Sequence, residues 1–276
     1  MEEVSASLGP RFQVERQVRR GAQGIVYKVR RLATRANEPA ADVLALKVYA
    51  PGTQLARIER EIDALERIRH PCTANLIEHG TLNLSAANTI YVACEFIEGT
   101  ALDERLMMGG ALPYRTVAVV GRDMAAALAA LWAERIVHRD VNPKNIMLRL
   151  DEMQAILIDL GVARHVRRHA LTSGPQAQGT QGYMSPEQNR AEQNLSALSD
   201  VFSLGVVLQE ALIGRHPNDN DQQGIMRRTI ATDDLDPKVP VELATTIDSM
   251  LSLRSSFRPP PAKLLEIFTR LATALR

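Results

Sequence analysis

The sequence predicts an α+β fold, in which a small strand-rich part is followed by a larger, mainly helical part. Before residue 97, short apolar and β-branched runs bounded by polar turns predict strands at residues 12–18, 43–49, 76–80 and 90–96. One helix is expected among them at residues 54–69, where apolar side chains recur at helical spacing. After residue 100 the pattern is mostly helical, at residues 102–108, 114–134, 201–213, 239–253 and 261–275. Strands gathered in one part and helices in another are typical of the α+β class.

The overall composition excludes several classes of protein. The formal net charge of +1 predicts no binding to nucleic acid or to a membrane surface. Two cysteines, Cys72 and Cys94, are too few for a disulfide framework and suit a reducing compartment. The first residues are acidic, so no signal peptide is expected, and no apolar run reaches the ~18 residues that a membrane helix needs. We therefore expect a cytoplasmic protein without a membrane segment, in which residues 1–10 form a loose leader.

Residues able to do chemistry gather in one stretch of the helical part. Asp140 and Asn145 lie in a polar segment between two short apolar runs, and a second carboxylate, Asp159, follows the next apolar run. Runs this short, separated by asparagine and proline, predict two strands with a polar loop between them. Two carboxylates and an amide suit a proton-accepting role and a hard cation, because Mg²⁺ prefers oxygen ligands and takes some of them from substrate phosphates.

These motifs resemble those of protein kinases. The pattern His138-Arg139-Asp140-Val141-x-x-x-Asn145, followed by Asp159-Leu160-Gly161, resembles the kinase catalytic loop and metal-binding motif. The segment GTQGYMSPE at residues 179–187 is similar to that of bacterial eukaryotic-like Ser/Thr kinases. The resemblance covers about residues 12–275 and implies a bilobal protein-kinase fold. Residues 11–96 would form a small, mostly antiparallel β N-lobe with one key helix, and residues 97–276 a larger, mainly helical C-lobe.

The N-lobe motifs imply an ATP site. Glycines let backbone N–H groups approach phosphate oxygens closely, and three residues match the kinase glycine-rich loop, Gly21, Gly24 and Val26. Arg19 stands where that loop has its first glycine. By the same resemblance, the side of the pocket that holds adenine is lined by the small residue Ala45 and by Cys94 as gatekeeper, and the backbones of Glu95 and Ile97 hydrogen-bond the base.

Lys47 is the charged residue of the N-lobe that most needs a partner. It lies in the middle of an apolar strand, where an unpaired ammonium is costly to bury, so it requires a carboxylate or a phosphate. Glu59, Glu61 and Glu66 of the following helix are candidate partners, and counting back from His70-Pro71 as in similar kinases selects Glu61. The alternative is a surface lysine on an edge strand.

The resemblance also assigns the reaction. Asp140 would accept or orient the substrate hydroxyl, and Asn145 and Asp159 would hold Mg²⁺, with Mn²⁺ as an alternative, on the ATP phosphates. Lys47 would grip the α- and β-phosphates. Ser/Thr kinases usually carry a lysine where this chain has Asn142, and we infer that Lys144 supplies the missing charge, as an arginine does in tyrosine kinases.

Residues 162–178 resemble an activation loop, with Thr172 and Ser173 as candidate phosphosites. Arg139 is the residue that pairs with such a phosphate in similar kinases, and a plain solvated hydroxyl is the alternative reading of each phosphosite. Beyond the loop, Thr180 would hydrogen-bond Asp140. Further expected contacts are Glu187 with Arg258, Asp200 with the catalytic loop, and Ser199 or Asp200 as the cap of the buried helix.

Three functions compete for this sequence. The first is a protein Ser/Thr kinase that acts on protein substrates and phosphorylates its own activation loop, which leaves room for a dimer acting in trans. The second is a pseudokinase that binds nucleotide and serves as a regulatory module, because Arg19 and Asn142 depart from the pattern. The third is a small-molecule kinase, against which the segment at residues 179–187 argues, since it serves a polypeptide substrate. We expect the first, because the positioning and metal groups needed for transfer are present.

Overall fold

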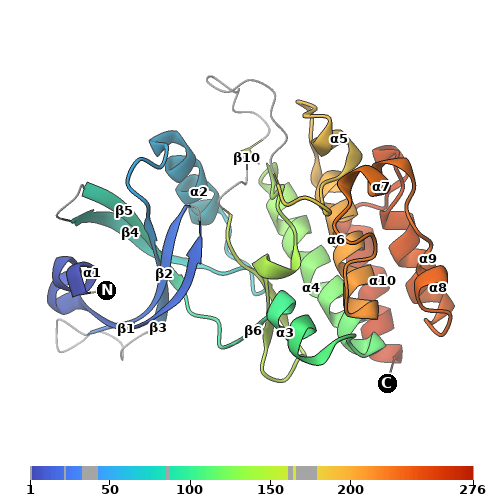
Figure 1. Cartoon of the computed structure of the whole chain (residues 1–276), viewed down its shortest axis with the longest axis horizontal. Helices are drawn as coiled ribbons and strands as arrows, with labels where there is room; N and C mark the ends of the chain where they lie inside the picture. The colour runs from blue at the N-terminus through green and yellow to red at the C-terminus, as the bar shows by residue number, and fades with distance from the viewer. Residues whose placement is uncertain are drawn as a thin grey trace. The chain divides into compact units, whose positions relative to one another are not determined.

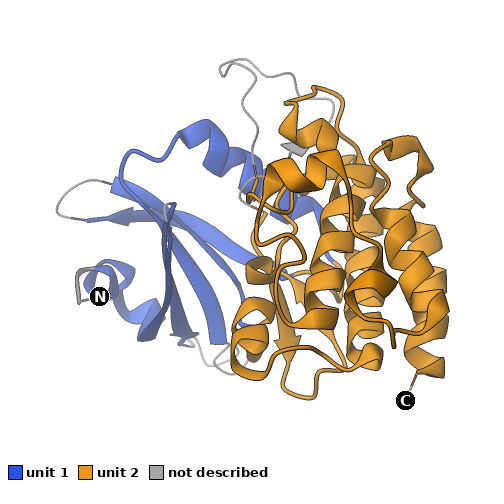
Figure 2. Ribbon diagram, turned by 45° about the vertical axis from the view of Figure 1, so that its right-hand side comes forward, with its two compact units in different colours: residues 1–69, 74–97 blue, residues 70–73, 98–276 orange. Residues whose placement is uncertain are grey.

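The structure is a computed structural model that describes residues 2–21, 23–32, 43–84, 88–160, 164–165 and 179–275. The chain divides into two compact units (Figure 2). Unit 1 consists of residues 1–69 and 74–97, and unit 2 of residues 70–73 and 98–276. The division after residue 97 lies next to the expected boundary, but the short loop at residues 70–73 belongs to unit 2, which was not expected.

Unit 1 is built on a five-stranded antiparallel sheet with strand order β1-β2-β3-β5-β4 (Figure 1). Each predicted strand is present, although β2 was not separated from the glycine-rich loop in the sequence. The elements are α1 (Glu2–Leu8), a 3₁₀ turn (Gly9–Arg11), β1 (Phe12–Gly21), β2 (Gly24–Arg31), β3 (Val43–Tyr49), α2 (Leu55–Arg67), β4 (Leu76–Asn83) and β5 (Asn88–Glu95).

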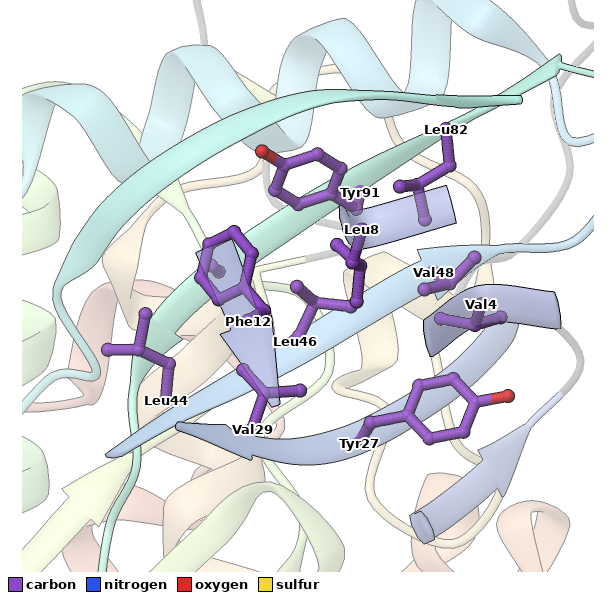
Figure 3. Close-up of a cluster of buried hydrophobic side chains, with 11 residues drawn as sticks. Val4, Leu8, Phe12, Tyr27, Val29, Leu44, Leu46, Val48, Leu82 and Tyr91 are labelled. Carbon is purple, nitrogen blue, oxygen red and sulfur yellow. The ribbon is translucent and has the colours of Figure 1, made fainter. Parts of the chain in front are cut away.

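The hydrophobic core of unit 1 lies on one face of this sheet and is covered by α1. Figure 3 shows the side chains of Val4 and Leu8 from α1 close to Leu46 and Val48 from β3. Alternate residues of a strand share a face, so Lys47, between these two, belongs to the opposite face. The prediction of a loose leader at residues 1–10 is wrong, because Val4 and Leu8 are one helical turn apart and are both buried, each 7% exposed.

Replacing Leu8 tests how much α1 stabilises the sheet. We expect Leu8→Ala to lower the free energy of unfolding by about 2–4 kcal/mol, because a buried leucine is removed and the sheet beneath it cannot fully collapse. Urea unfolding followed by circular dichroism measures this loss. The control is Ala6→Ser at an exposed position of the same helix, expected to change stability by less than about 0.5 kcal/mol. A loss no larger than that of the control would show that α1 does not stabilise unit 1.

Unit 2 is mainly helical and carries two small sheets, with order β6-β8-β9 and β10-β7. Among its helices, α10 packs against α4, and α6 packs against α4 and α9 (Figure 1). Its strands are β6 (Gly99–Ala101), β7 (Ile136–Val137), β8 (Ile146–Arg149), β9 (Ala155–Leu157) and β10 (Arg164–His165). Its helices and 3₁₀ turns are α3 (Leu102–Gly109), α4 (Tyr114–Ala133), η2 (Pro143–Asn145), α5 (Pro186–Asn189), α6 (Ala197–Ile213), α7 (Gln222–Arg227), α8 (Thr232–Leu235), α9 (Val241–Met250), η3 (Ser255–Phe257) and α10 (Pro261–Ala274).

The buried helix α6 positions several site residues and begins earlier than expected. Ser196 caps it by accepting the N–H of Leu198, so the predicted cap at Ser199 or Asp200 is wrong. The apolar run that reveals the helix in the sequence begins after its first turn, in which Ala197 and Leu198 are followed by the polar residues Ser199 and Asp200. The helix ends at Gly214 with φ +75°, where a Cβ atom would lie 2.5 Å from the backbone nitrogen of Ala111.

The helix α4 is the part of the described chain that most resembles a membrane span. It is long and apolar enough by length and composition, contrary to the expectation that no stretch would qualify, but 67% of its apolar window is buried inside the protein. A core helix has the same properties, so α4 is weak evidence for a membrane span.

Candidate active site

The catalytic loop connects β7 to β8, and the buried side chain of Asp200 fixes its backbone. The carboxylate of Asp200, 1% exposed, accepts the backbone N–H groups of His138 and Arg139 at 2.8 Å each. Burial raises the pKa of Asp200, and the two N–H donors and the nearby charge of His138 oppose that rise. Arg139 has φ +69°, a conformation that costs energy for a residue with a side chain and that persists only where the surroundings enforce it. The predicted bracing contact of Asp200 is therefore present.

Asp140 is held at both carboxylate oxygens. Its Oδ1 atom accepts the backbone N–H of Thr180 at 2.9 Å and the Thr180 hydroxyl at 2.6 Å. Its Oδ2 atom accepts the side-chain amide of Asn145 at 3.1 Å. These donors fix the orientation of the carboxylate and leave its Oδ2 atom with an accepting position beside Asn145. The geometry therefore suits the orientation of a hydroxyl group at Oδ2.

Asn145 and Asp159 are brought together by the backbone. The N–H of Ile158, directly before Asp159, donates to the carbonyl of Asn145 at 2.8 Å. The amide nitrogen of Asn145 is used by Asp140, so its Oδ1 atom is the end that a cation could take. Asp159 is exposed and has φ +65°, a second strained backbone position in the site.

This pair fits Mg²⁺ better than a metal bound by protein alone. The described residues contain no group of three or more His, Cys, Asp or Glu side chains that could hold a metal ion. Mg²⁺ is commonly held by one or two carboxylates together with substrate phosphates. The carboxylate of Asp159 and the amide oxygen of Asn145 are therefore enough for a cation that takes its other ligands from substrate phosphates. Gly161, the last residue of this motif, lies outside the described residues.

Unit 1 pairs Lys47 with Glu61, as predicted. The Lys47 ammonium on β3 lies 2.7 Å from Glu61 Oε1 on α2. The Glu61 side chain is 2% exposed and the Lys47 side chain 15%, so the pair is largely shielded from water. The surface-lysine alternative is wrong, because β3 is an inner strand of the sheet.

The sheet face that carries Lys47 also gathers the other predicted nucleotide residues. Residues directly opposite in an antiparallel sheet share a face, and β-sheet pairing places Val26 opposite Lys47 and Ala45 opposite Cys94. Gly24 has φ +152°, and a Cβ atom there would lie 2.1 Å from the carbonyl oxygen of Val48. Only glycine fits this position. Gly21 meets nothing comparable, so the structure gives no such reason for a glycine there.

At the end of β5, directly after Cys94, the backbone N–H of Glu95 is already hydrogen-bonded. This N–H is one of the backbone groups of Glu95 and Ile97 that were expected to bind adenine. The N–H of Glu95 donates to the carbonyl of Asn75 at 3.0 Å, and the Glu95 carboxylate accepts the Asn75 amide at 3.1 Å. The backbone N–H of Glu95 is therefore already used within unit 1. Ile97 is buried, 6% exposed, and ends unit 1.

A comparison with known families decides the identity of the chain. The family model "Protein kinase domain" matches residues 12–267. The chain belongs to the protein kinase family. The expectation of a kinase fold with a β-sheet N-lobe, unit 1, and a helical C-lobe, unit 2, is therefore confirmed.

Bacterial Ser/Thr kinases are among the relatives of this kinase domain. It is 34% identical to serine/threonine-protein kinase PknD of Mycobacterium tuberculosis over 241 residues, which is 85% of this chain and 34% of PknD. It is 33% identical to PknL of the same organism over 237 residues, 86% of this chain and 56% of PknL. With AfsK of Streptomyces coelicolor it shares 29% identity over 261 residues, 93% of this chain and 31% of AfsK. The kinase domain thus spans from about a third to about half of these relatives.

In the kinase domain, the segment after the predicted activation loop is anchored by buried polar contacts. The N–H of Gly182 donates to Gln222 Oε1 at 2.9 Å, and Tyr183 donates its hydroxyl to Glu210. His216 is 6% exposed, and its Nε2 atom lies 3.1 Å from the carbonyl of Gly182. Burial lowers the pKa of His216, which favours the neutral ring whose Nδ1 atom accepts the N–H groups of Asn218 and Asn220. The segment that follows residue 178 is therefore held by buried side chains of Glu210, His216 and Gln222.

The same segment ends in the predicted pair of Glu187 with Arg258. The guanidinium holds both carboxylate oxygens, Nη1 to Oε1 at 2.6 Å and Nη2 to Oε2 at 3.0 Å. Arg258 also donates to the carbonyls of Leu198 and Ser252, and Ser199 donates its hydroxyl to Glu187. The Arg258 side chain is fully buried. This buried bidentate pair, with its bonds to Leu198 and Ser199, fixes the end of the segment to α6.

The candidate phosphosites and Asn142 are the remaining residues that bear on the site. Thr172 and Ser173, the candidate phosphosites, lie outside the described residues. Asn142, treated in the sequence only as a departure from the kinase pattern, proves to be part of the site, because its amide reaches both Asp140 and Thr180. Its position beside a proline in a polar loop, typical of an asparagine that bonds the neighbouring backbone, is the signal that could have indicated this.

Proposed function

We propose that this kinase domain transfers the γ-phosphoryl group of ATP to serine and threonine hydroxyls of proteins. The observation that carries the proposal is the environment of Asp140, whose Oδ1 atom is occupied by Thr180 while Oδ2 keeps an accepting position beside Asn145. Phosphoryl transfer depends on positioning and charge stabilisation more than on a strong base. The names of the relatives support Ser/Thr rather than Tyr as acceptor.

Each predicted residue has a place in this proposal. Asp140 orients the acceptor hydroxyl, and Asn145 and Asp159 are the residues that hold Mg²⁺ or Mn²⁺, which supplies charge stabilisation on the phosphates when bound. Lys47, placed by Glu61, binds the α- and β-phosphates, and exposed Lys144 adds positive charge at the catalytic loop. The residues proposed for the base and the phosphate loop are Gly21, Gly24, Val26, Ala45, Cys94, Glu95 and Ile97.

The regulation and location of the domain are further parts of the proposal. Arg139, beside Asp140, pairs with a phosphate on Thr172 or Ser173 after autophosphorylation, for which a second copy of the chain acting in trans is one route. Neither Cys72 nor Cys94 forms a disulfide bond, which agrees with action in the reducing cytoplasm. Its partners are protein substrates.

The nucleotide half of the proposal is tested by replacing Lys47. We expect Lys47→Met to lower kcat/KM for MgATP by about 10²-fold or more, because a preorganised cation on the phosphates is lost. The control is Arg67→Met, which removes an exposed cation paired with Asp63 on α2 and should leave MgATP use unchanged. Equal use of MgATP by Lys47→Met and wild type would show that Lys47 does not act on the nucleotide.

A further inference from the structure

The side chain of Asn142 is buried in the catalytic loop, and both its amide nitrogen and its amide oxygen form hydrogen bonds. The residue is 2% exposed. Its amide nitrogen donates to the carbonyl oxygen of Asp140 at 2.9 Å and to the hydroxyl oxygen of Thr180 at 3.2 Å. Its amide oxygen accepts the backbone N–H of Lys144 at 3.0 Å. One short side chain thus contacts three residues that are central to the proposed function.

The contact with Thr180 determines where the threonine proton goes. A hydroxyl has one proton to donate, and the amide nitrogen of Asn142 can only donate. Thr180 Oγ1 therefore accepts from Asn142 and gives its own proton to Asp140 Oδ1, 2.6 Å away. This fixes the orientation of the Asp140 carboxylate and leaves Oδ2, on the side of Asn145, as the oxygen that meets a substrate.

The contact with Lys144 determines the path of the backbone. By accepting the Lys144 N–H, Asn142 caps the 3₁₀ turn η2, in which Lys144 is the middle residue. A capping side chain satisfies a donor that the turn itself leaves open. The exposed Lys144 side chain therefore starts from a backbone position that Asn142 sets.

We propose that Asn142 is a positioning residue. Where similar kinases have one lysine, this chain uses two side chains, Asn142 to orient the catalytic loop and Lys144 to carry the positive charge. The neutral amide of Asn142 orients Thr180 and Asp140, which it can do while buried, and the cation is moved to Lys144, where it is solvated. The proposal rests on the proposed function of Asp140 and Lys144. It goes beyond that function because Asn142 itself touches neither phosphate nor acceptor.

Removing the amide should affect the transfer step more than nucleotide binding. We expect Asn142→Ala to lower kcat by about 10- to 100-fold on a generic protein acceptor, because misplacement of a catalytic group has effects of this order. KM for MgATP should change by less than about twofold, since Lys47 and the sheet face of unit 1 are untouched. Asn142→Asp keeps the shape and the Lys144 cap but has no donor, so it should lose kcat in the same way and serves if the alanine variant does not fold. Wild-type kcat in either folded variant would overturn the proposal.

Moving the positive charge from position 144 back to position 142 tests the division of tasks between Asn142 and Lys144 directly. We expect Asn142→Lys combined with Lys144→Met to be at least about tenfold more active than Lys144→Met alone, because a lysine at 142 can both donate to Thr180 and carry the charge. A purely structural role for Asn142 predicts no such rescue. A double variant no more active than Lys144→Met would contradict the division of tasks.

Two controls in the same assay separate this inference from the proposed function. Asp221→Ala removes an exposed side-chain cap from α7, which accepts the N–H of Gln223 at 3.0 Å, and should leave kcat unchanged. Asp140→Asn reports on the proposed function. Full transfer by Asp140→Asn would overturn that function, whereas loss in Asp140→Asn with full activity in Asn142→Ala would overturn only the role of Asn142.

Discussion

Replacing Asp140 by asparagine is expected to lower phosphoryl transfer by about 10²- to 10⁴-fold, the range in which positioned acid–base groups contribute. The replacement keeps the shape of the side chain, but the substrate hydroxyl loses an anionic acceptor. Thr180 and Asn145, which now donate to the carboxylate, would face an amide. Binding of MgATP, measured by calorimetry, should change little, because Asp140 is assigned to the acceptor and not to the nucleotide.

The control for this variant is Asp151→Asn. Asp151 is an exposed aspartate in the turn between β8 and β9, where it accepts the N–H of Met153. Its replacement removes the same charge from the same unit and should leave transfer unchanged. Turnover by Asp140→Asn equal to that of Asp151→Asn would rule out the assigned role of Asp140.

Replacing Arg258 by methionine is expected to have the largest effect on stability. Glu187 would keep the hydrogen bond from Ser199 but lose its ionic partner inside the protein. Breaking a buried pair by removing one member typically costs about 3–5 kcal/mol, because a charge is left uncompensated. We expect a loss of this size in urea unfolding at pH 7. The exposed pair of Arg190 and Glu192 supplies the control, and Arg190→Ala should cost at most about 1 kcal/mol.

The pH dependence of unfolding distinguishes a lost ion pair from lost packing. Burial acts to raise the pKa of Glu187, but the hydrogen bonds and charge of Arg258 outweigh it and hold the pKa below its usual value of 4.5. The pair therefore stabilises the fold fully above pH 4.5, and this contribution is lost as the pH falls through the lower, folded-state pKa. Wild type and Arg258→Met should approach each other in stability on acidification. A difference that stays constant down to that range would indicate lost packing alone.

The local pattern of the sequence was sufficient for most of the fold. β3 is where its apolar run predicted it, because β-branched residues between polar turns have few alternatives. α1 was missed because its helical signal consists of only two buried residues, Val4 and Leu8, in a short acidic segment. The start of α6 was missed because its first turn mixes apolar and polar residues, and burial there depends on contacts with distant residues.

The prediction of the candidate site depended more on the family resemblance than on the hydrophobic pattern of the sequence. Glu187 and Arg258 are far apart in the chain, and no periodicity links them; their pairing was expected only because similar kinases show it. The helical pattern of α2 alone left Glu59, Glu61 and Glu66 open as partners of Lys47, and the structure buries Glu61 beside the lysine. Asn142 departs from the family, so the resemblance assigned it no role. Its place beside a proline is typical of an asparagine that bonds the neighbouring backbone, but its contact with Thr180 appears only in three dimensions.

The most direct test of the central claim is incubation of the chain with γ-labelled ATP, Mg²⁺ and a generic protein acceptor, followed by identification of the labelled residues by mass spectrometry. We expect phosphoserine and phosphothreonine on protein, with Thr172 or Ser173 of the chain itself among the labelled residues. MgATP bound without any transfer, or label found only on a small molecule, would contradict the proposal of a protein Ser/Thr kinase.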